Sequence, residues 1–226
     1  MIAGKTVLVV AAHPDDEALG CGGTIARLSA SGSKVHILFL ADGETARAGA
    51  SKDMLAKRRR IATEAAAKLG AQNPGFLDFP DNRLDSVNFL DVVQAIEKHA
   101  SGIGPDLVLT HFGGDLNVDH RACAEAVLTA FRPVPDQSVR SILAFEVPSS
   151  TEWRVAAGAT GFAPNAFFDV SATLDVKRSA LEIYAREMRD FPHPRSVEGV
   201  AALARWRGAS VGVGAAEAFV VLRTMQ

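Results

Sequence analysis

The sequence is poor in several features, and each absence excludes a class of protein. It has two cysteines in 226 residues, Cys21 and Cys123, too few for the disulfide framework of a small secreted domain and more typical of buried thiols in a reducing compartment. No apolar run reaches the roughly 18 residues of a membrane span. The formal net charge is -2 at pH 7, which argues against a broad basic surface for nucleic acid. We therefore expect a cytoplasmic protein that binds neither nucleic acid nor membrane.

Apolar residues are what the sequence has in quantity. They make up 48% of the chain, enough for one core without a disulfide or metal staple, so we expect a single domain over 1–226. Runs rich in aliphatic and β-branched residues predict strands at 6–12, 34–41, 76–79, 106–112, 141–147, 166–170 and 217–223. Helical patterns predict helices at about 15–31, 51–69, 88–100, 119–131, 175–189 and 197–207. This alternation predicts an α/β fold with a mainly parallel sheet between helices.

A histidine and three acids directly follow the first predicted strand. Pro14 suits the first position of a helix, and Asp15, Asp16 and Glu17 suit the positive end of its dipole, so the stretch is compatible with an ordinary helix start. That interpretation leaves His13 unexplained. It also leaves unexplained why the polar residues lie at the carboxyl end of a strand, where open α/β sheets place their ligands. A histidine and an aspartate three residues apart can aim a nitrogen and an oxygen at one metal ion.

A third ligand is offered by the segment after the predicted strand 106–112. Asp119 and His120 open the next predicted helix, and because a protonated histidine is disfavoured at a helix N-terminus, His120 is better explained as a neutral ligand or a hydrogen-bonded neutral ring. A catalytic zinc site uses three protein ligands and leaves the fourth position for water. The two segments together therefore predict a site for zinc or another divalent metal.

Two competing motifs do not fit. The run "DLNVD" (115–119) resembles the start of a calcium-binding EF-hand loop, but His120 stands where glycine is required and Ala126 where glutamate is required. The glycines of "GCGG" (20–23) do not make a dinucleotide-binding motif, because Ile25 occupies the last glycine position and three acids would face the pyrophosphate. Close helix packing explains these glycines better.

With both segments in view, the chain resembles the LmbE-like, or PIG-L, family of zinc-dependent N-deacetylases. The resemblance covers nearly the whole chain, through "AHPDDEALGCGGTIARL" (12–28), "LADGE" (40–44), the "DHR" segment (119–121), "DVSATLDVKRSALEIYAREM" (169–188) and "AEAFVVLR" (216–223). An exact His-Pro-Asp-Asp-Glu occurs by chance in roughly one in ten thousand chains of this length. The resemblance implies a Rossmann-like fold, a homo-oligomer, and the removal of an acetyl group from an N-acetylated amino sugar or conjugate.

The resemblance also assigns roles to residues. It implies that His13, Asp16 and His120 hold zinc and that Asp15 is the general base and acid. Zinc lowers the pKa of bound water to about 7 and polarises a carbonyl group, and a carboxylate beside the ligands can take the proton of that water and return it to the leaving amine. Glu17 either supports a ligand histidine or is an acid of the helix start.

The segment before His120 departs from a pattern found in part of the family. Several relatives carry His-Pro-Asp-His, whose first histidine helps to stabilise the oxyanion and whose aspartate pairs with that histidine. Asn117 and Asp119 occupy the matching positions here, and we assign both to the catalytic set. Asn117 is either an oxyanion donor or a helix cap. His111 and His193 are further candidates for a charged partner, although structural or solvent-facing roles suit them better.

Other polar residues that follow predicted strands are candidates for substrate contacts. Asp42 and Glu44 follow the second strand and are expected to contact sugar hydroxyls. Arg58 lies in the basic run 57–60, which is otherwise a solvated helix face, and it matches an arginine that the family often places at the start of this helix. The remaining candidates, at the rim or as a stacking platform, are Asp81, Asn82, Trp153 and His193. Trp206 is expected in the core.

Three other functions stay open at this stage. The first is an amidase that cleaves a larger acyl or amino-acyl amide with the same metal. The second is a non-catalytic sugar-binding or assembly subunit that the metal stabilises, which would have no need of Asp15. The third is a metal-free hydrolase with a pair of carboxylates, whose activity would resist chelators.

Overall fold

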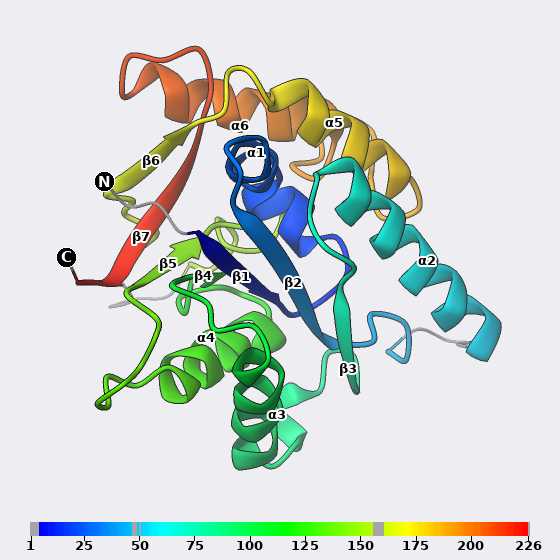
Figure 1. Ribbon diagram of the computed structural model, residues 1–226. Coiled ribbons are helices and arrows are strands. Elements are labelled where there is room, and N and C mark those ends of the chain that lie inside the picture. The colour runs from blue at the N-terminus through cyan, green and yellow to red at the C-terminus, as the bar shows by residue number, and fades with distance from the viewer. Residues whose placement is uncertain (1–4, 47–48, 50, 156–160, 226) are drawn as a thin grey trace.

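A seven-stranded sheet forms the centre of the structure, a computed structural model that describes residues 5–46, 49, 51–155 and 161–225 (Figure 1). Its strands are β1 (Thr6–Ala11), β2 (Lys34–Ala41), β3 (Gly75–Phe79), β4 (Leu107–His111), β5 (Ser141–Phe145), β6 (Ala166–Asp169) and β7 (Ala216–Thr224). The order is β3-β2-β1-β4-β5-β7-β6; the first five strands in that order are parallel, and β7 is antiparallel to both β5 and β6. The predicted α/β fold with a mainly parallel sheet is confirmed.

Helices cover both faces of this sheet. They are α1 (Asp16–Ala30), α2 (Lys52–Lys68), α3 (Phe89–Ser101), α4 (Val118–Ala130), α5 (Leu174–Ile183) and α6 (Val197–Ala209), with a short 3-10 helix at Leu84–Ser86. In Figure 1, α1, α2, α5 and α6 lie on one side and α3 and α4 on the other. Val7 and Val9 of β1 belong to the apolar cluster under α1, whereas Leu8 and Val10 belong to the cluster under α3 and α4. Since side chains of a strand alternate between faces, β1 is apolar throughout because both faces are buried.

Two glycines let α1 lie close to its neighbours. A Cβ atom at Gly20 would clash with the ring of Phe145, and one at Gly23 would lie 2.9 Å from side-chain atoms of Val170. The packing explanation of the "GCGG" run is thereby confirmed. Cys21 and Cys123 are both buried and free, as predicted.

Two predictions for the last third of the chain were wrong. The helix expected over 175–189 ends at Ile183, because the chain then turns so that the Tyr184 hydroxyl donates to Glu17 and Glu187 pairs with Arg58. Trp206, expected in the core, is 70% exposed. It lies on the outer side of α6, whose inward side carries small and aliphatic residues, among them Val200, Ala201, Ala204 and Gly208.

A buried ion pair ties the end of the chain to α1. Glu217 of β7 accepts hydrogen bonds from the main-chain N–H groups of Gly23 (2.9 Å) and Thr24 (2.6 Å) and from Lys177 Nζ of α5. Lys177 Nζ also donates to the carbonyl oxygen of Leu19 (2.8 Å). These amides are free because α1 has a non-helical residue at Cys21 (φ -142°), which interrupts its hydrogen-bond ladder. The pair therefore fixes α5 and β7 to the helix whose first turn carries the polar motif.

The described helices include none that is long and apolar enough to span a membrane.

Candidate active site

His13, Asp16 and His120 meet at the carboxyl ends of β1 and β4. His13 follows β1, Asp16 begins α1 and His120 lies in the first turn of α4. Asp16 Oδ2 is 3.2 Å from His13 Nδ1 and 3.3 Å from His120 Nε2, and all three side chains are buried. The strand order reverses between β1 and β4, which is where open α/β sheets bind ligands. Two imidazole nitrogens and a carboxylate oxygen, within 4.8 Å of one another, are a donor set that suits Zn²⁺.

A second group of possible ligands overlaps the first. His13 Nε2 is 3.2 Å from Asp81 Oδ1 and 2.9 Å from Asp119 Oδ2. The carboxylates of this group already accept hydrogen bonds: Asp119 from the N–H groups of Asn82 (2.7 Å) and Leu84 (2.9 Å), and Asp81 from Asn82 Nδ2 (2.9 Å). Asp16 Oδ2 also accepts one, from the His13 N–H (2.9 Å). We favour the first group as the metal site because two imidazole nitrogens and one carboxylate oxygen suit Zn²⁺ better than one nitrogen and two carboxylates. Asp119 then holds the far nitrogen of His13, the arrangement that orients metal-binding histidines in proteins.

Asp115 does the same for His120, and the sequence did not reveal it. Its Oδ1 is 3.0 Å from His120 Nδ1. The same carboxylate accepts hydrogen bonds from the hydroxyl groups of Ser150 and Thr151, which lie in the loop after β5, and from the N–H of Asn117. Burial alone would raise the pKa of Asp115, but His120 and the hydroxyl groups of Ser150 and Thr151 lower it to about 2. Asp115 is therefore a fixed anion that sets the orientation of the His120 ring.

Changing Asp115 to asparagine should weaken the binding of a divalent cation by about 10- to 100-fold, the usual cost of losing such a carboxylate behind a ligand histidine. A competition titration of Zn²⁺ against a chromophoric chelator measures this. The exposed Asp136 offers a matched control, because Asp136→Asn makes the same chemical change in the loop before β5, whereas the candidate ligands lie at the carboxyl ends of the strands. An Asp115→Asn protein with unchanged affinity would show that Asp115 does not support the site.

His111 is built into the framework beside this cluster. Its Nε2 accepts the N–H of Ala12 (2.9 Å), and its ring stacks on that of His120 with 4.0 Å between centroids. Burial lowers its pKa to about 3, with the positive charge of His120 as a smaller cause, so the ring is neutral. His111 is therefore a neutral ring that secures the end of β1, which is the structural role that the sequence favoured for it.

Asp15 lies on a strained turn. Its φ of 128° is a backbone conformation that costs a non-glycine residue about 1–3 kcal/mol and that occurs mainly at functional positions. Glu17 stabilises this turn, because its carboxylate accepts the N–H of Asp15 (3.0 Å) and the hydroxyl of Tyr184 (2.7 Å). Burial raises the pKa of Glu17 to about 8. Glu17 thus supports Asp15 through the main chain.

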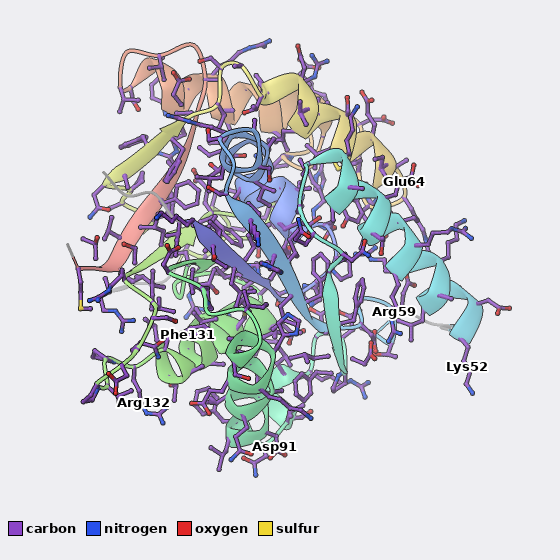
Figure 2. The ribbon with its side chains drawn as sticks, viewed as in Figure 1. Lys52, Arg59, Glu64, Asp91, Phe131 and Arg132 are labelled. Carbon is purple, nitrogen blue, oxygen red and sulfur yellow. The ribbon has the colours of Figure 1, made fainter. Side chains whose placement is uncertain are left out.

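Two arginines flank the Asp15 carboxylate. Arg195 Nη1 is 3.2 Å from Oδ2, and Arg58 Nη2 is 3.7 Å from Oδ1. Arg58 is itself buried, donates to the carbonyl oxygen of Pro14 (2.5 Å) and pairs with Glu187. Burial raises the pKa of Asp15 above its ordinary value, while Arg195 and Arg58 oppose the rise. Lys52 and Glu64 of the same helix as Arg58 instead extend outward (Figure 2).

A cavity of about 150 Å³ opens beside these groups. It brings together most of the predicted site residues with two that the sequence did not reveal, Glu187 and Arg195. The predicted residues in its lining are His13, Asp15, Asp16, Arg58, Asp81, Asn82, Asn117 and His120. Asp15 therefore lines the same cavity as the three candidate metal ligands.

Asn117 is the cap of α4. Its Oδ1 accepts the N–H of Asp119 (2.8 Å), and its Nδ2 donates to Asn82 Oδ1 (3.0 Å). Of the two roles that the sequence left open for Asn117, the structure shows the cap.

The other four predicted substrate residues lie outside the cavity lining. Asp42 accepts hydrogen bonds from the N–H groups of Glu44 and Thr45 and closes the loop after β2. Glu44 is buried and pairs with Arg186 (3.1 Å). Trp153 is 47% exposed and meets the ring of His193 edge-on, with 5.7 Å between centroids.

The fold and this cluster define an α/β protein with a candidate mononuclear metal centre at the switch point of its sheet. Residues 8–131 match the family model described as "PIG-L: GlcNAc-PI de-N-acetylase". Because this match spans more than half of the chain, the protein belongs to the PIG-L family, and the resemblance found in the sequence is confirmed.

Known proteins resemble the chain over most of its length. It is 34% identical to the diacetylchitobiose deacetylase of Thermococcus kodakarensis over 80% of this chain and 69% of that protein. Its structure resembles that of the conserved protein TT1542 from Thermus thermophilus, with a TM-score of 0.77 and 28% identity over 97% of this chain and 96% of that one. GalB, the 4-carboxy-2-hydroxymuconate hydratase of Pseudomonas putida, gives a TM-score of 0.78 at 22% identity over 98% and 97% of the two chains. The fold alone thus does not select the reaction.

Proposed function

We propose that this protein is a metal-dependent deacetylase that hydrolyses the acetamide of an N-acetylated amino sugar or amino-sugar conjugate to acetate and a free amine. The observation that carries the proposal is the carboxylate of Asp15 in the same cavity as the converging donors of His13, Asp16 and His120. Family membership and the named activity of the Thermococcus relative support the choice of an N-acetylated sugar.

The residues at the site fit a single divalent cation, and Zn²⁺ best. His13, Asp16 and His120 would hold it, and the buried carboxylates around them favour a positive charge at this point. When bound, such a cation polarises a carbonyl group and lowers the pKa of water to about 7. Three protein ligands leave a position for water, whereas a structural zinc site is closed by a fourth ligand. Asp15 would be surplus in a purely structural site.

Asp15 has the position and environment of a general base. Arg58 and Arg195 favour its ionised form, so that it can accept a proton from the attacking water. Burial raises its pKa, which makes the protonated form accessible and lets Asp15 return the proton to the leaving nitrogen. Asp119 and Asp115 meanwhile hold the two imidazole rings through their far nitrogens.

We assign some of the predicted substrate contacts to residues that line the cavity and others to residues outside it. Asn82 and Asn117 line the cavity and are suited to contact sugar hydroxyls near the acetamide. Arg58 is held by Pro14, Asp15 and Glu187, so we assign it to the positioning of Asp15. Trp153 has an exposed ring outside the cavity lining, so it is suited to stack on a further part of the substrate. The homo-oligomer stays a prediction.

A screen of N-acetylated sugars, nucleotide sugars and glycosides tests the proposal. We expect equal amounts of acetate and free amine from at least one of them, loss of this activity after chelation, and recovery when Zn²⁺ is added back. Parallel reactions with the same sugars carrying a bulky acyl group provide the comparison. Faster release of the bulky acyl group would establish the amidase instead, and full activity in the presence of chelator would contradict metal dependence.

A further inference from the structure

The structure places the neutral amide of Asn117 where part of the family carries a histidine that can be charged. Water attack on an amide carbonyl places negative charge on its oxygen, and enzymes stabilise that charge with fixed hydrogen-bond donors. Asn117 stands at the matching position, where its Oδ1 accepts the Asp119 N–H and one hydrogen of its Nδ2 goes to Asn82, so it offers a neutral amide rather than a charged ring. A charged donor for the oxyanion would have to come from another side chain of the cavity.

Of the two arginines in the cavity lining, Arg195 is the more exposed. Arg58 is buried, and it contacts the carbonyl oxygen of Pro14 and the carboxylate of Glu187. The Arg195 side chain is 23% exposed. It donates from Nη1 to Asp15 and from Nε to Ser149 Oγ (3.1 Å). Within the described residues its remaining nitrogen, Nη2, has no hydrogen-bond partner.

Arg195 is held in place by the loops around it. Its N–H donates to His193 Nδ1 (3.0 Å), its carbonyl oxygen accepts the N–H of Arg189 (3.1 Å), and Ser149 of the loop after β5 fixes the guanidinium. A donor that is already oriented costs little reorganisation as charge develops, which is what makes oxyanion stabilisation effective. A guanidinium is also planar and permanently charged, so it can contact two oxygens side by side.

We propose that Arg195 is a catalytic residue that donates from its guanidinium to the oxyanion of the tetrahedral intermediate, in place of the histidine missing at position 117. The inference rests on the proposed function. The oxygen of water attacks the carbonyl carbon, its proton goes to Asp15, and the carbonyl π pair moves onto the oxygen that faces Arg195. The oxyanion pair then re-forms the carbonyl group, and the C–N bonding pair leaves on the nitrogen, which takes the proton back from Asp15. The products are the amine and acetic acid, which ionises to acetate, and Arg195 stays protonated throughout.

A charged analogue of the intermediate tests the contact without turnover. The methylphosphonamidate of glucosamine presents tetrahedral anionic oxygens where the acetamide would react. We expect Arg195→Ala to weaken its binding by about 100-fold in a calorimetric titration, while binding of N-acetylglucosamine to the same variant changes by less than about 3-fold. Equal losses for both ligands, or none for the analogue, would overturn the proposal.

A double-mutant cycle separates the oxyanion contact from an action through Asp15. If Arg195 acts only by holding Asp15, its removal should have no effect on analogue binding once Asp15 is already asparagine. We expect the loss of about 100-fold to persist when Arg195→Ala is made in the Asp15→Asn protein. Its disappearance in that background would show that Arg195 is a positioning residue and would overturn the proposal.

Steady-state kinetics give a second readout. On the substrate found by the screen, Arg195→Ala should lower kcat by about 10²- to 10³-fold with little change in KM. Added guanidine should restore part of the rate of Arg195→Ala. Arg195→Lys keeps the positive charge and should retain more activity than Arg195→Ala; it also replaces the alanine variant if that variant fails to fold. Arg189→Ala is the matched control, because among the described residues the exposed Arg189 side chain donates hydrogen bonds only to the carbonyl oxygens of Arg186 and Met188.

The two proposals fail in different ways. An active wild type with near-normal kcat in Arg195→Ala would overturn the role of Arg195 alone and leave the deacetylase standing. A wild type that releases no acetate from any N-acetylated sugar would overturn both.

Discussion

Asp15→Asn should lower kcat for deacetylation by about 10²- to 10⁴-fold, the range expected when a general base is removed. Asparagine has nearly the size of aspartate but cannot accept the proton of the attacking water. The converging donors of His13, Asp16 and His120 do not include Asp15, so the variant should still bind its metal. The expected result is therefore a folded, metal-loaded and nearly inactive protein.

The measurement combines initial rates of acetate release with elemental analysis of the purified variant. Asp175→Asn serves as the control, since the Asp175 side chain is 92% exposed on α5. A near-normal rate for Asp15→Asn would rule out Asp15 as the base. A variant without metal would instead place Asp15 among the ligands.

His120→Ala should weaken Zn²⁺ binding by more than about 100-fold, beyond the loss expected for a residue behind a ligand, and acetate release should fall with it. The change leaves His13 and Asp16 as the only members of the triad. It also leaves Asp16 and Asp115 buried without the imidazole that lies between them, 3.3 and 3.0 Å from their oxygens. The neighbouring His111 is poorly suited to take the place of the lost nitrogen, because its Nε2 already accepts the N–H of Ala12.

Thermal unfolding gives a readout of metal binding that is independent of activity. A cation that binds only the native state raises the unfolding temperature of the wild type as its concentration rises, and His120→Ala should lose this dependence. His36→Ala on β2 is a suitable control, with its imidazole away from the cluster.

Burial lowers the pKa of His120, but the carboxylates of Asp16 and Asp115 raise it more strongly, to about 9. Metal uptake by the wild type at pH 7 should therefore release a proton. If the unfolding temperature of His120→Ala still rises with cation concentration as that of the wild type does, His120 is not a ligand.

Local sequence predicted the part of the site that depends on strand ends. His13 and Asp16 are three residues apart, and the alternation of apolar runs with helical patterns placed them at the same sheet edge as His120. The strand 34–41 was predicted with the bounds that β2 has. These features depend on side-chain periodicity and turn chemistry, which act over a few residues.

The rest of the site depends on contacts between distant segments. Asp115 becomes the partner of His120 because Ser150 and Thr151, 35 and 36 residues further along, donate to it. Arg195 reaches Asp15 across 180 residues of sequence. Neither contact leaves a local pattern. Trp206 was misplaced for a related reason: an indole fits a core or a surface equally well by type, and only the packing of α6 decides between them.

The ion pair between Lys177 and Glu217 sets a rule for building chimeras of this protein with its relatives. The family match ends at residue 131, yet Glu187 and Arg195 enter the cavity from the segment that follows. Exchanging that segment would be a direct way to change the cavity wall without altering the three candidate ligands. A junction between positions 177 and 217 would separate the lysine from its glutamate, and a buried charge that loses its partner costs about 3–5 kcal/mol. Junctions before position 177 or after position 217 take both charged residues from the same parent, so the crossover points of a recombination library should be placed there.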